Sequence, residues 1–400
     1  MSHADVVIVG GGIVGLATGL KLRTRYPDLR ITLIEAESAV GTHQSGHNSG
    51  VLHSGIYYKP GSKKATCCRA GKLEMEEFCT AHSIAWDKCG KVVVATSETE
   101  LSRLDNIAER AGLNGVHCER INSDQLRELE PAAAGISALH VPETGIVNYR
   151  SVCQKMAQLL LAEGSRIELN FELVDIQHVG DGLELRGKKG HKIPCGKLIN
   201  CGGLQSDRIC KMAGIDTNLK VVPFRGEYYE LAPTSQSLCR NLIYPVPDPS
   251  FPFLGVHFTR MIDGGVECGP NAVLALARDG YSWRDVNLND LTDTLAFRGF
   301  RKLAAKHWRM GLGEMHRSIS KQAFVNALQK LIPSIKPSDL VAGRAGVRAQ
   351  TVTPTGELVD DFLFEANHHS IHVLNAPSPA ATASLAIANH IVDRFADQFR

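Results

Sequence analysis

The fold is decided by ten residues near the start of the chain, Val6-Val7-Ile8-Val9-Gly10-Gly11-Gly12-Ile13-Val14-Gly15. The continuous run of β-branched residues predicts a strand that is buried on both faces of a parallel sheet. Apolar residues then recur at helical spacing through 13–22, and a second apolar run follows at 31–34. The sequence therefore predicts one parallel βαβ unit.

The glycines of this unit match G-x-G-x-x-G, the fingerprint of a dinucleotide site. Gly10 permits the tight turn, Gly12 lets backbone N–H groups approach a pyrophosphate, and Gly15 brings the helix against the strand. The helix begins at Ile13 and Val14, so its N-terminus faces the bound anion.

Glu35 ends the second strand, where an acid accepts hydrogen bonds from the adenosine ribose and disfavours the 2′-phosphate of NADP. The alternative is a glycine-rich turn that binds nothing. Strand, motif, helix and acid all stand where a dinucleotide needs them, which argues against that alternative. The motif alone does not separate NAD from FAD.

Composition narrows the class of protein. The 400 residues suit two domains, and 44 Lys and Arg balance 42 Asp and Glu, which excludes the broad basic surface of a nucleic-acid-binding protein. The 11 cysteines contain no C-x-x-C pair, so we expect no metal site. The polar first residues predict no signal peptide and hence a cytoplasmic protein. No run of about 20 apolar residues occurs, which leaves peripheral contact with the inner face of a membrane open.

Blocks along most of the chain resemble one family of flavoenzymes. The blocks are HQSGHNSG at 43–50, VLHSGIYY at 51–58, PFRGEYY at 223–229, LIYPVPDP at 242–249, GVH at 255–257, RMIDG at 260–264, GPNA at 269–272, AGVRAQ at 345–350 and NAPSPAAT at 375–382. They resemble FAD enzymes of the D-amino-acid-oxidase-like superfamily and, within it, the L-2-hydroxyglutarate oxidases and dehydrogenases. The resemblance implies FAD as cofactor and oxidation of L-2-hydroxyglutarate to 2-oxoglutarate, by hydride transfer from C2 to flavin N5. Quinone or oxygen then takes the electrons.

The resemblance also implies a mixed α/β fold, in which a Rossmann-type FAD-binding domain is interleaved with a substrate domain on a mostly antiparallel sheet. Strands predicted at 91–96, 221–231, 253–258 and 264–268 favour such a second sheet. We expect the FAD-binding domain at 1–90, 145–222 and 340–400, and the substrate-binding domain at 91–144 and 223–339.

Further cofactor contacts are carried over from the family. Ser45, Asn48 and Ser49 are expected to line the flavin, although such a cluster is otherwise typical of a surface turn. The backbone of Val174 is expected at the adenine, and Gly202 follows the short strand predicted at 197–201. In the last block, Pro379 is expected to start a helix through 395 whose N-terminus stabilises the reduced flavin. That places Pro377, Ser378, Pro379 and Ala380 at the cofactor.

The substrate residues follow from the chemistry of a 2-hydroxy acid. Arg348 is the expected carboxylate clamp, with a structural ion pair as the alternative. The expected base is His53 or His257. His53 is favoured because the resemblance places the block 51–58, in which it stands, near the flavin. A second carboxylate needs a cation or hydroxyl, for which the candidates are Arg225, Arg260, Tyr57, Tyr58 and Tyr244.

Two other functions stay open at this point. The first is an amine oxidase of the sarcosine or glycine type, which needs no contact for a second carboxylate. The other is a flavin-binding redox protein without catalysis. A basic, aromatic stretch at 295–312 further predicts one amphipathic helix that docks on anionic lipid, with packing on the substrate domain as the alternative.

Overall fold

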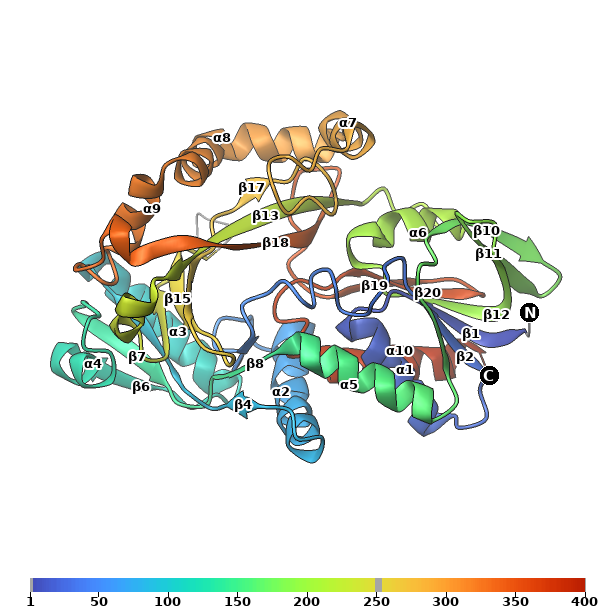
Figure 1. The fold of residues 1–400 in the computed structure, drawn as a ribbon, viewed down its shortest axis with the longest axis horizontal. Helices are drawn as coiled ribbons and strands as arrows, with labels where there is room; N and C mark the ends of the chain where they lie inside the picture. Colours follow the sequence, from blue (N-terminus) through green and yellow to red (C-terminus); the bar gives the residue numbers. More distant parts are fainter. Residues whose placement is uncertain (1–2, 249–253, 400) are drawn as a thin grey trace.

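The computed structural model describes residues 3–248 and 254–399, which form two large sheets and their covering helices (Figure 1). The first sheet is built around β1 (Ala4–Val9), which lies parallel to β12 (Lys192–Asn200) and β2 (Ile31–Ile34). Its other strands are β9 (Arg166–Glu168), β10 (Leu173–Val179), β11 (Gly182–Gly187), β19 (Leu363–Ala366) and β20 (Ser370–Asn375).

Both faces of β1 are covered, which is why its sequence is apolar without alternation. Val6 and Ile8 pack in the cluster formed with α1 (Ile13–Arg25), whereas Val7 and Val9 pack on the other side with Ile209 of α6 (Ser206–Met212). The remaining helices on the side of α1 are α2 (Lys63–Ala81), α5 (Tyr149–Ala162) and α10 (Ser384–Phe399) (Figure 1).

The second sheet has nine strands and is antiparallel except where β14 (Leu242–Pro245) runs parallel to β5 (Lys91–Ala95). Its longest pair is β13 (Lys220–Leu231) with β18 (Leu340–Val352). The others are β6 (Glu119–Asn122), β7 (Ser137–Val141), β15 (His257–Arg260), β16 (Val266–Gly269) and β17 (Val273–Leu274).

Helices α7 (Leu288–Ala296), α8 (Arg298–Ile319) and α9 (Lys321–Leu328) arch over this second sheet (Figure 1). Shorter elements complete the chain. They are a three-stranded sheet of β3 (Val51–Leu52), β4 (Trp86–Asp87) and β8 (Gly145–Val147), helices α3 (Leu101–Leu113) and α4 (Ser123–Leu129), and the turns η1 (Glu98–Glu100), η2 (Gly203–Gln205), η3 (Pro233–Leu238) and η4 (Pro337–Asp339).

The predicted combination of a parallel-rich sheet with an antiparallel one is confirmed. Three details differ from expectation. The stretch 295–312 is not one helix, because α7 ends at Ala296 and α8 starts at Arg298, with extended backbone at Phe297 between them. The strand expected at 253–258 begins only at His257, and residue 253 lies outside the described residues. The segment 340–400 serves both sheets, since β18 pairs with β13 rather than with the first sheet.

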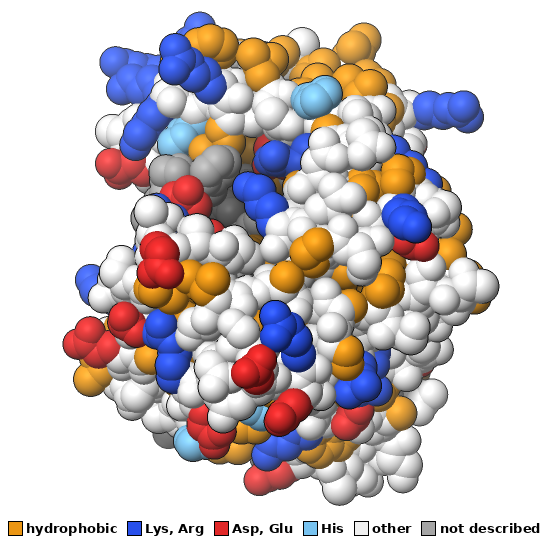
Figure 2. Space-filling model, turned by 90° about the vertical axis from the view of Figure 1, so that its left-hand side faces the viewer, with side chains coloured by type: hydrophobic (Ala, Val, Ile, Leu, Met, Phe, Trp, Pro, Cys, Tyr) orange, Lys and Arg blue, Asp and Glu red, His pale blue; other side chains and the backbone are white. Residues whose placement is uncertain are grey.

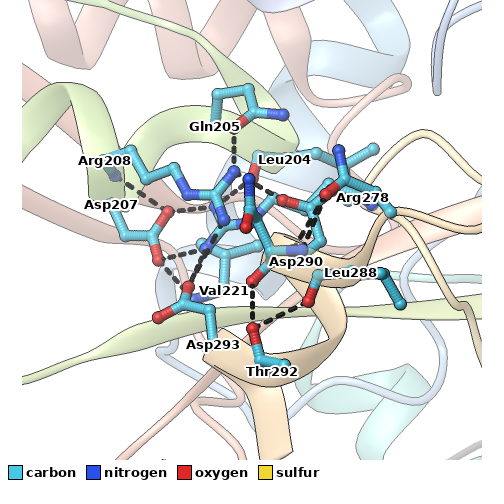
Figure 3. Close-up of polar contacts among 12 residues, drawn as sticks. Leu204, Gln205, Asp207, Arg208, Val221, Arg278, Leu288, Asp290, Thr292 and Asp293 are labelled. Atoms are coloured by element: carbon cyan, nitrogen blue, oxygen red, sulfur yellow. Dashed lines mark hydrogen bonds and ion pairs between the residues drawn. The ribbon is translucent and has the colours of Figure 1, made fainter.

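Ion pairs at the junction of the two sheets join α6 to α7 and β13 (Figure 3). Arg278, which is 1% exposed, bonds the Leu204 carbonyl at 2.5 Å and the Asp207 carboxylate through both terminal nitrogens. Asp207 also accepts the Val221 N–H of β13 at 3.0 Å. Arg208 of α6 reaches Asp290 of α7 at 2.7 Å. One buried ion pair, Arg278–Asp207, and one partly buried pair, Arg208–Asp290, therefore join the elements beside the site described next.

Candidate active site

A cavity of about 1400 Å³ is lined by residues of both sheets. Every predicted cofactor residue except Gly15 lines it. So do six of the eight predicted catalytic and substrate-binding residues, namely His53, His257, Arg348, Tyr57, Tyr58 and Tyr244. Pockets for single drug-sized ligands have volumes of about 300–1,000 Å³, so this cavity has room for a large cofactor and a small substrate.

The phosphate end of the cavity is formed by the glycine motif. Gly10 has φ +108°, and a Cβ there would lie 2.5 Å from the Cys201 carbonyl oxygen. A Cβ on Gly15 would lie 2.1 Å from the Gly10 oxygen, so Gly15 serves helix packing rather than the cavity. Gly12 is different, because its Cβ would meet only Ser45 Oγ, at 3.2 Å, and the space beyond belongs to the cavity. The N-terminus of α1 therefore faces a space that fits a pyrophosphate.

Glu35 lies at the end of β2 and borders the same cavity. Its Oε2 accepts the Gly11 N–H at 2.6 Å and its Oε1 accepts the Glu37 N–H at 2.9 Å. These bonds fix the carboxylate, and each oxygen keeps a second lone pair for a ribose hydroxyl. Val174, 44% exposed, and Gly202 also border the cavity.

The loop 43–50 is stabilised by hydrogen bonds within the loop and by hydrogen bonds from the second sheet. Asn48 Nδ2 donates to the carbonyls of Gln44 and Ser45, at 3.0 and 2.9 Å, while Ser45 Oγ accepts the Ile13 N–H at 2.9 Å. Arg344 of β18 donates to the Asn48 carbonyl at 2.9 Å. Sequence reasoning missed Arg344, and an arginine in an antiparallel strand carries no signal that it reaches a loop some 300 positions away.

The last block lines the cavity as predicted, but its helix starts later than expected. Residues 378–383 form turns, and α10 begins at Ser384 rather than at Pro379. Thr382 explains the delay, since its hydroxyl contacts the Tyr149 hydroxyl at 2.8 Å and accepts the His53 N–H at 3.1 Å. The predicted helix start at Pro379 is therefore wrong, whereas the contact of this segment with the flavin stays a prediction.

Two neutral histidines lie at the other end of the cavity. Burial lowers the pKa of His53 to about 3 and that of His257 to about 4, with Lys91 adding to the effect on both. His257 Nδ1 lies 2.8 Å from the Gly255 carbonyl oxygen, so Nδ1 carries the proton and Nε2 is left as an acceptor. His53 Nε2 lies 3.3 Å from Ser378 Oγ. Both rings are therefore in the protonation state of a general base.

Arg348 and three tyrosines share this end of the cavity. Burial lowers the pKa of Arg348, an effect that Tyr228 and Glu314 oppose, and the guanidinium remains protonated. Burial raises the pKa of Tyr57, Tyr58 and Tyr244, so their hydroxyls stay neutral and act as donors.

Two of the expected substrate residues do not line the cavity. Arg225 is fully buried on the face of β13 opposite to Gly226 and Tyr228, because successive side chains of a strand alternate. Its guanidinium pairs with Glu227 at 2.9 Å and lies 4.3 Å from the Trp283 ring. Arg260 pairs with Asp87. Among the described residues, no group of three or more His, Cys, Asp or Glu is placed to hold a metal ion.

Comparison with known proteins identifies the family. The family DAO, FAD dependent oxidoreductase, matches residues 5–394. Proteins named L-2-hydroxyglutarate dehydrogenase are similar along nearly the whole chain. The one from Indibacter alkaliphilus is 48% identical over 97% of this chain and 98% of its own, the Escherichia coli K12 protein 47% over 98% and 92%, and the human mitochondrial protein 43% over 100% and 90%.

Solved structures agree on the fold. L-α-glycerophosphate oxidase from Mycoplasma pneumoniae with FAD bound has a TM-score of 0.80 at 20% identity and covers 98% of this chain and 94% of its own. Glycine oxidase from Geobacillus kaustophilus has a TM-score of 0.75 at 18% identity, with 100% and 96% covered. FAD is thus the cofactor for which this cavity is built. The chain belongs to the DAO family of FAD-dependent oxidoreductases, among its L-2-hydroxyglutarate dehydrogenases.

Proposed function

We propose that this flavoenzyme oxidises L-2-hydroxyglutarate to 2-oxoglutarate with Arg348 as the carboxylate clamp and a neutral histidine as the base. The proposal is carried by one observation: a single cavity joins the dinucleotide motif to Arg348, His53 and His257. Bound FAD supplies the hydride acceptor at N5. The relatives that bear the substrate's name are 42–48% identical to the chain.

Each residue has a defined task. Arg348 binds the C1 carboxylate through a bidentate guanidinium, which orients C2 and its hydroxyl. His53 takes the hydroxyl proton, because it lies against the 376–382 turn on the cofactor side. His257 is the alternative base, since its Nδ1 bond leaves Nε2 as an acceptor.

The first experiment follows flavin absorbance in the anaerobic holoenzyme. L-2-hydroxyglutarate should bleach the flavin, whereas its D-enantiomer, sarcosine and glycine should not. Bleaching by sarcosine or glycine instead would favour the amine oxidase, and bleaching by none would favour a non-catalytic flavoprotein. His53→Asn and His257→Asn are then compared, and the variant with the larger loss in reduction rate marks the base. If both variants reduced the flavin as fast as the wild type, neither histidine would be the base.

We further propose that α8 docks on anionic lipid, so that the electrons pass to a membrane quinone. The aromatic residues near the start of the stretch 295–312, Phe297 and Phe300, are partly buried and pack against the cluster that contains Leu303, so they are not part of the lipid-facing surface. A different stripe faces solvent at helical spacing, with Trp308 56%, Leu312 60%, Met315 40% and Ile319 77% exposed.

Exposed cations precede this stripe or lie at its start, namely Arg298, Arg301, Lys302 and Lys306 before the irregular backbone at His307, and Arg309 after it. Figure 2 shows hydrophobic and basic side chains side by side at the top of the molecule, where α8 lies in Figure 1. An apolar stripe beside like charges fits an anionic lipid surface better than a second copy of the same helix, because two basic helices repel each other. Within 3–248 and 254–399, no helix is long and apolar enough to cross a membrane.

Liposome co-sedimentation tests the docking. Vesicles with anionic lipid should bind the wild type at low salt, and a variant with Glu at 301, 302 and 306 should bind less. A variant with Ser at 308 and 312 tests the apolar part. Equal, negligible binding by all three proteins would remove the membrane proposal, and self-association that the Ser variant abolishes would point to a dimer instead. Oxygen or a soluble acceptor would then receive the electrons.

A further inference from the structure

Lys91 is a buried lysine next to the end of the cavity that holds Arg348, His53 and His257. It is not among the substrate residues expected from the sequence. It begins β5 and is only 2% exposed. Among the described residues, no carboxylate lies within ion-pair distance of its Nζ. The other fully buried lysine, Lys72, is paired with Glu76. A buried charge without a counter-ion is costly, so its presence calls for an explanation.

Two tyrosine rings stand between Lys91 and the cavity. The ammonium lies 4.5 Å from the ring centroid of Tyr57 and 5.0 Å from that of Tyr244, within the range of cation–π contacts. Both tyrosines line the cavity, whereas Lys91 does not. The Tyr57 hydroxyl is buried and has no hydrogen-bond partner in the protein. A ligand that accepts a hydrogen bond there would satisfy the hydroxyl and place a negative charge near the ammonium.

The charges at this end fit a dianion. Arg348 is a permanent cation, Lys91 is a second cation at or below about pH 7, and the neighbouring histidines and tyrosines are neutral. A dicarboxylic acid compensates both cations at once. A monocarboxylic acid held by Arg348 gains nothing from Lys91, so the site favours the diacid.

We propose that Lys91 determines specificity for dicarboxylic 2-hydroxy acids, because its charge, acting through Tyr57, holds the second carboxylate of the substrate. Lys91 is thus a positioning residue, and this inference rests on the proposed function. It replaces Arg225 and Arg260, which do not reach the cavity.

The inference also predicts how binding depends on pH. Burial lowers the pKa of Lys91 to about 7. The groups around Lys91 on other elements do not titrate between pH 6 and 9: the pKa of His53 and His257 is about 3 and 4, that of Cys68 is about 12, and burial raises those of Tyr57, Tyr58 and Tyr244. Arg348 stays charged, and Lys72 of α2 is held by Glu76.

The direction in which affinity changes with pH follows from these charges. Below pH 7 the ammonium is present and attracts the dianion, and above pH 7 it is lost in the free enzyme. Affinity for a diacid therefore falls as the pH rises through about 7, by at most about tenfold per pH unit, because binding then requires uptake of one proton. A monocarboxylate does not show this dependence.

The test uses binding, not turnover. Glutarate is a diacid without a hydroxyl, and valerate is its monocarboxylic counterpart of the same length. Their Kd values are measured from the change in flavin absorbance of the holoenzyme. Lys91→Met should weaken glutarate about 10- to 100-fold, the effect of losing a charge-assisted contact, and should leave valerate nearly unchanged. Tyr57→Phe should weaken glutarate selectively but less, and Lys72→Met, the matched buried lysine, should not change the preference.

The result that overturns the inference is equal weakening of both acids, or none, in Lys91→Met. Lys91→Gln provides a second neutral variant if Lys91→Met does not fold. A glutarate affinity in the wild type that is flat from pH 6 to 9 overturns it equally. Failure of the proposed function looks different: the wild-type flavin is then not reduced by L-2-hydroxyglutarate at all, whatever the variants bind.

Discussion

Replacing Arg278 by Met removes the central cation of the domain junction. The guanidinium is 2% exposed and bonds the Leu204 carbonyl and both oxygens of Asp207. The variant keeps the apolar stem but leaves the Asp207 carboxylate, 9% exposed, without its ion-pair partner. Two backbone N–H groups, of Arg208 and Val221, still bond that carboxylate at 2.9 and 3.0 Å.

The expected cost follows from this geometry. Removing one partner of a buried ion pair costs about 3–5 kcal/mol, and the two remaining N–H bonds favour the lower end. With an unfolding entropy of about 2.1 cal/mol/K per residue, a chain of this length loses roughly 1 °C in Tm for each kcal/mol. Arg278→Met should therefore lower Tm by about 3–5 °C. FAD should also dissociate faster, because Leu204 and Asp290 of the junction line the cavity.

The assay is thermal unfolding of the holoenzyme, followed by flavin fluorescence and by circular dichroism. Arg278→Met is compared with Arg127→Ala, which breaks an exposed pair with Asp124 and should change Tm little. The double variant Arg278→Met, Asp207→Asn should recover part of the loss, since no charge then lies buried alone. A Tm for Arg278→Met equal to that of Arg127→Ala, or no recovery in the double variant, would refute the reasoning.

Three further predictions concern the cavity. Gly12→Val should fold, because Gly12 has φ −76° and a Cβ there meets only Ser45 Oγ, but absorbance scans should show no bound flavin. Gly10→Val should fail to fold, because Gly10 has φ +108° and its Cβ would lie 2.5 Å from a carbonyl oxygen. Full flavin content in Gly12→Val would contradict the assignment of Gly12 to the pyrophosphate site. Arg348→Ala should lower kcat/KM for L-2-hydroxyglutarate about 30- to 3,000-fold with flavin retained, the loss of a buried charge contact of about 2–5 kcal/mol; a wild-type value would make Arg348 structural. Lys91→Met should be more stable than the wild type at pH 6, and the gain should shrink between pH 7 and 10. The pKa of Lys91 in the folded protein, about 7, lies below its value in the unfolded chain, so the free energy of unfolding of the wild type rises between pH 7 and 10 by at most about 1.4 kcal/mol per pH unit. The measurement is urea unfolding of both proteins at several pH values. A difference in stability between them that does not change with pH would show that the pKa of Lys91 is not lowered by folding.

The cofactor half of the site was predictable because its signals are local. Gly10, Gly12 and Glu35 stand at fixed offsets within one βαβ unit, and the resemblance blocks supplied Ser45, Asn48 and 377–380. The helix expected at Pro379 shows the limit of such signals. Proline favours the first turn of a helix, but bonds of Thr382 to distant residues hold this segment in turns until Ser384.

The substrate half depends on side-chain direction and on distant packing. Whether Arg225 faces the cavity depends on the register of β13 with β18, which places Gly226 and Tyr228 on the cavity side instead. Lys91 is the first residue of the otherwise apolar strand β5, and lysine is usually exposed. Its burial comes from Tyr57 and Tyr244, which approach from other segments of the chain. No local pattern encodes such a meeting.

The order of strands in the first sheet has a consequence for biosynthesis. β1 is made first, but it pairs with β12 from 192–200, and β12 in turn pairs with β20 from 370–375. The cavity wall likewise needs 346–350 and 376–382. A nascent chain therefore carries its nucleotide motif long before it has a place to hold the nucleotide, and such distant pairings form slowly. A complete flavin site therefore forms only after the segment 346–382 has been made, so cofactor binding depends on the folding of nearly the whole described chain.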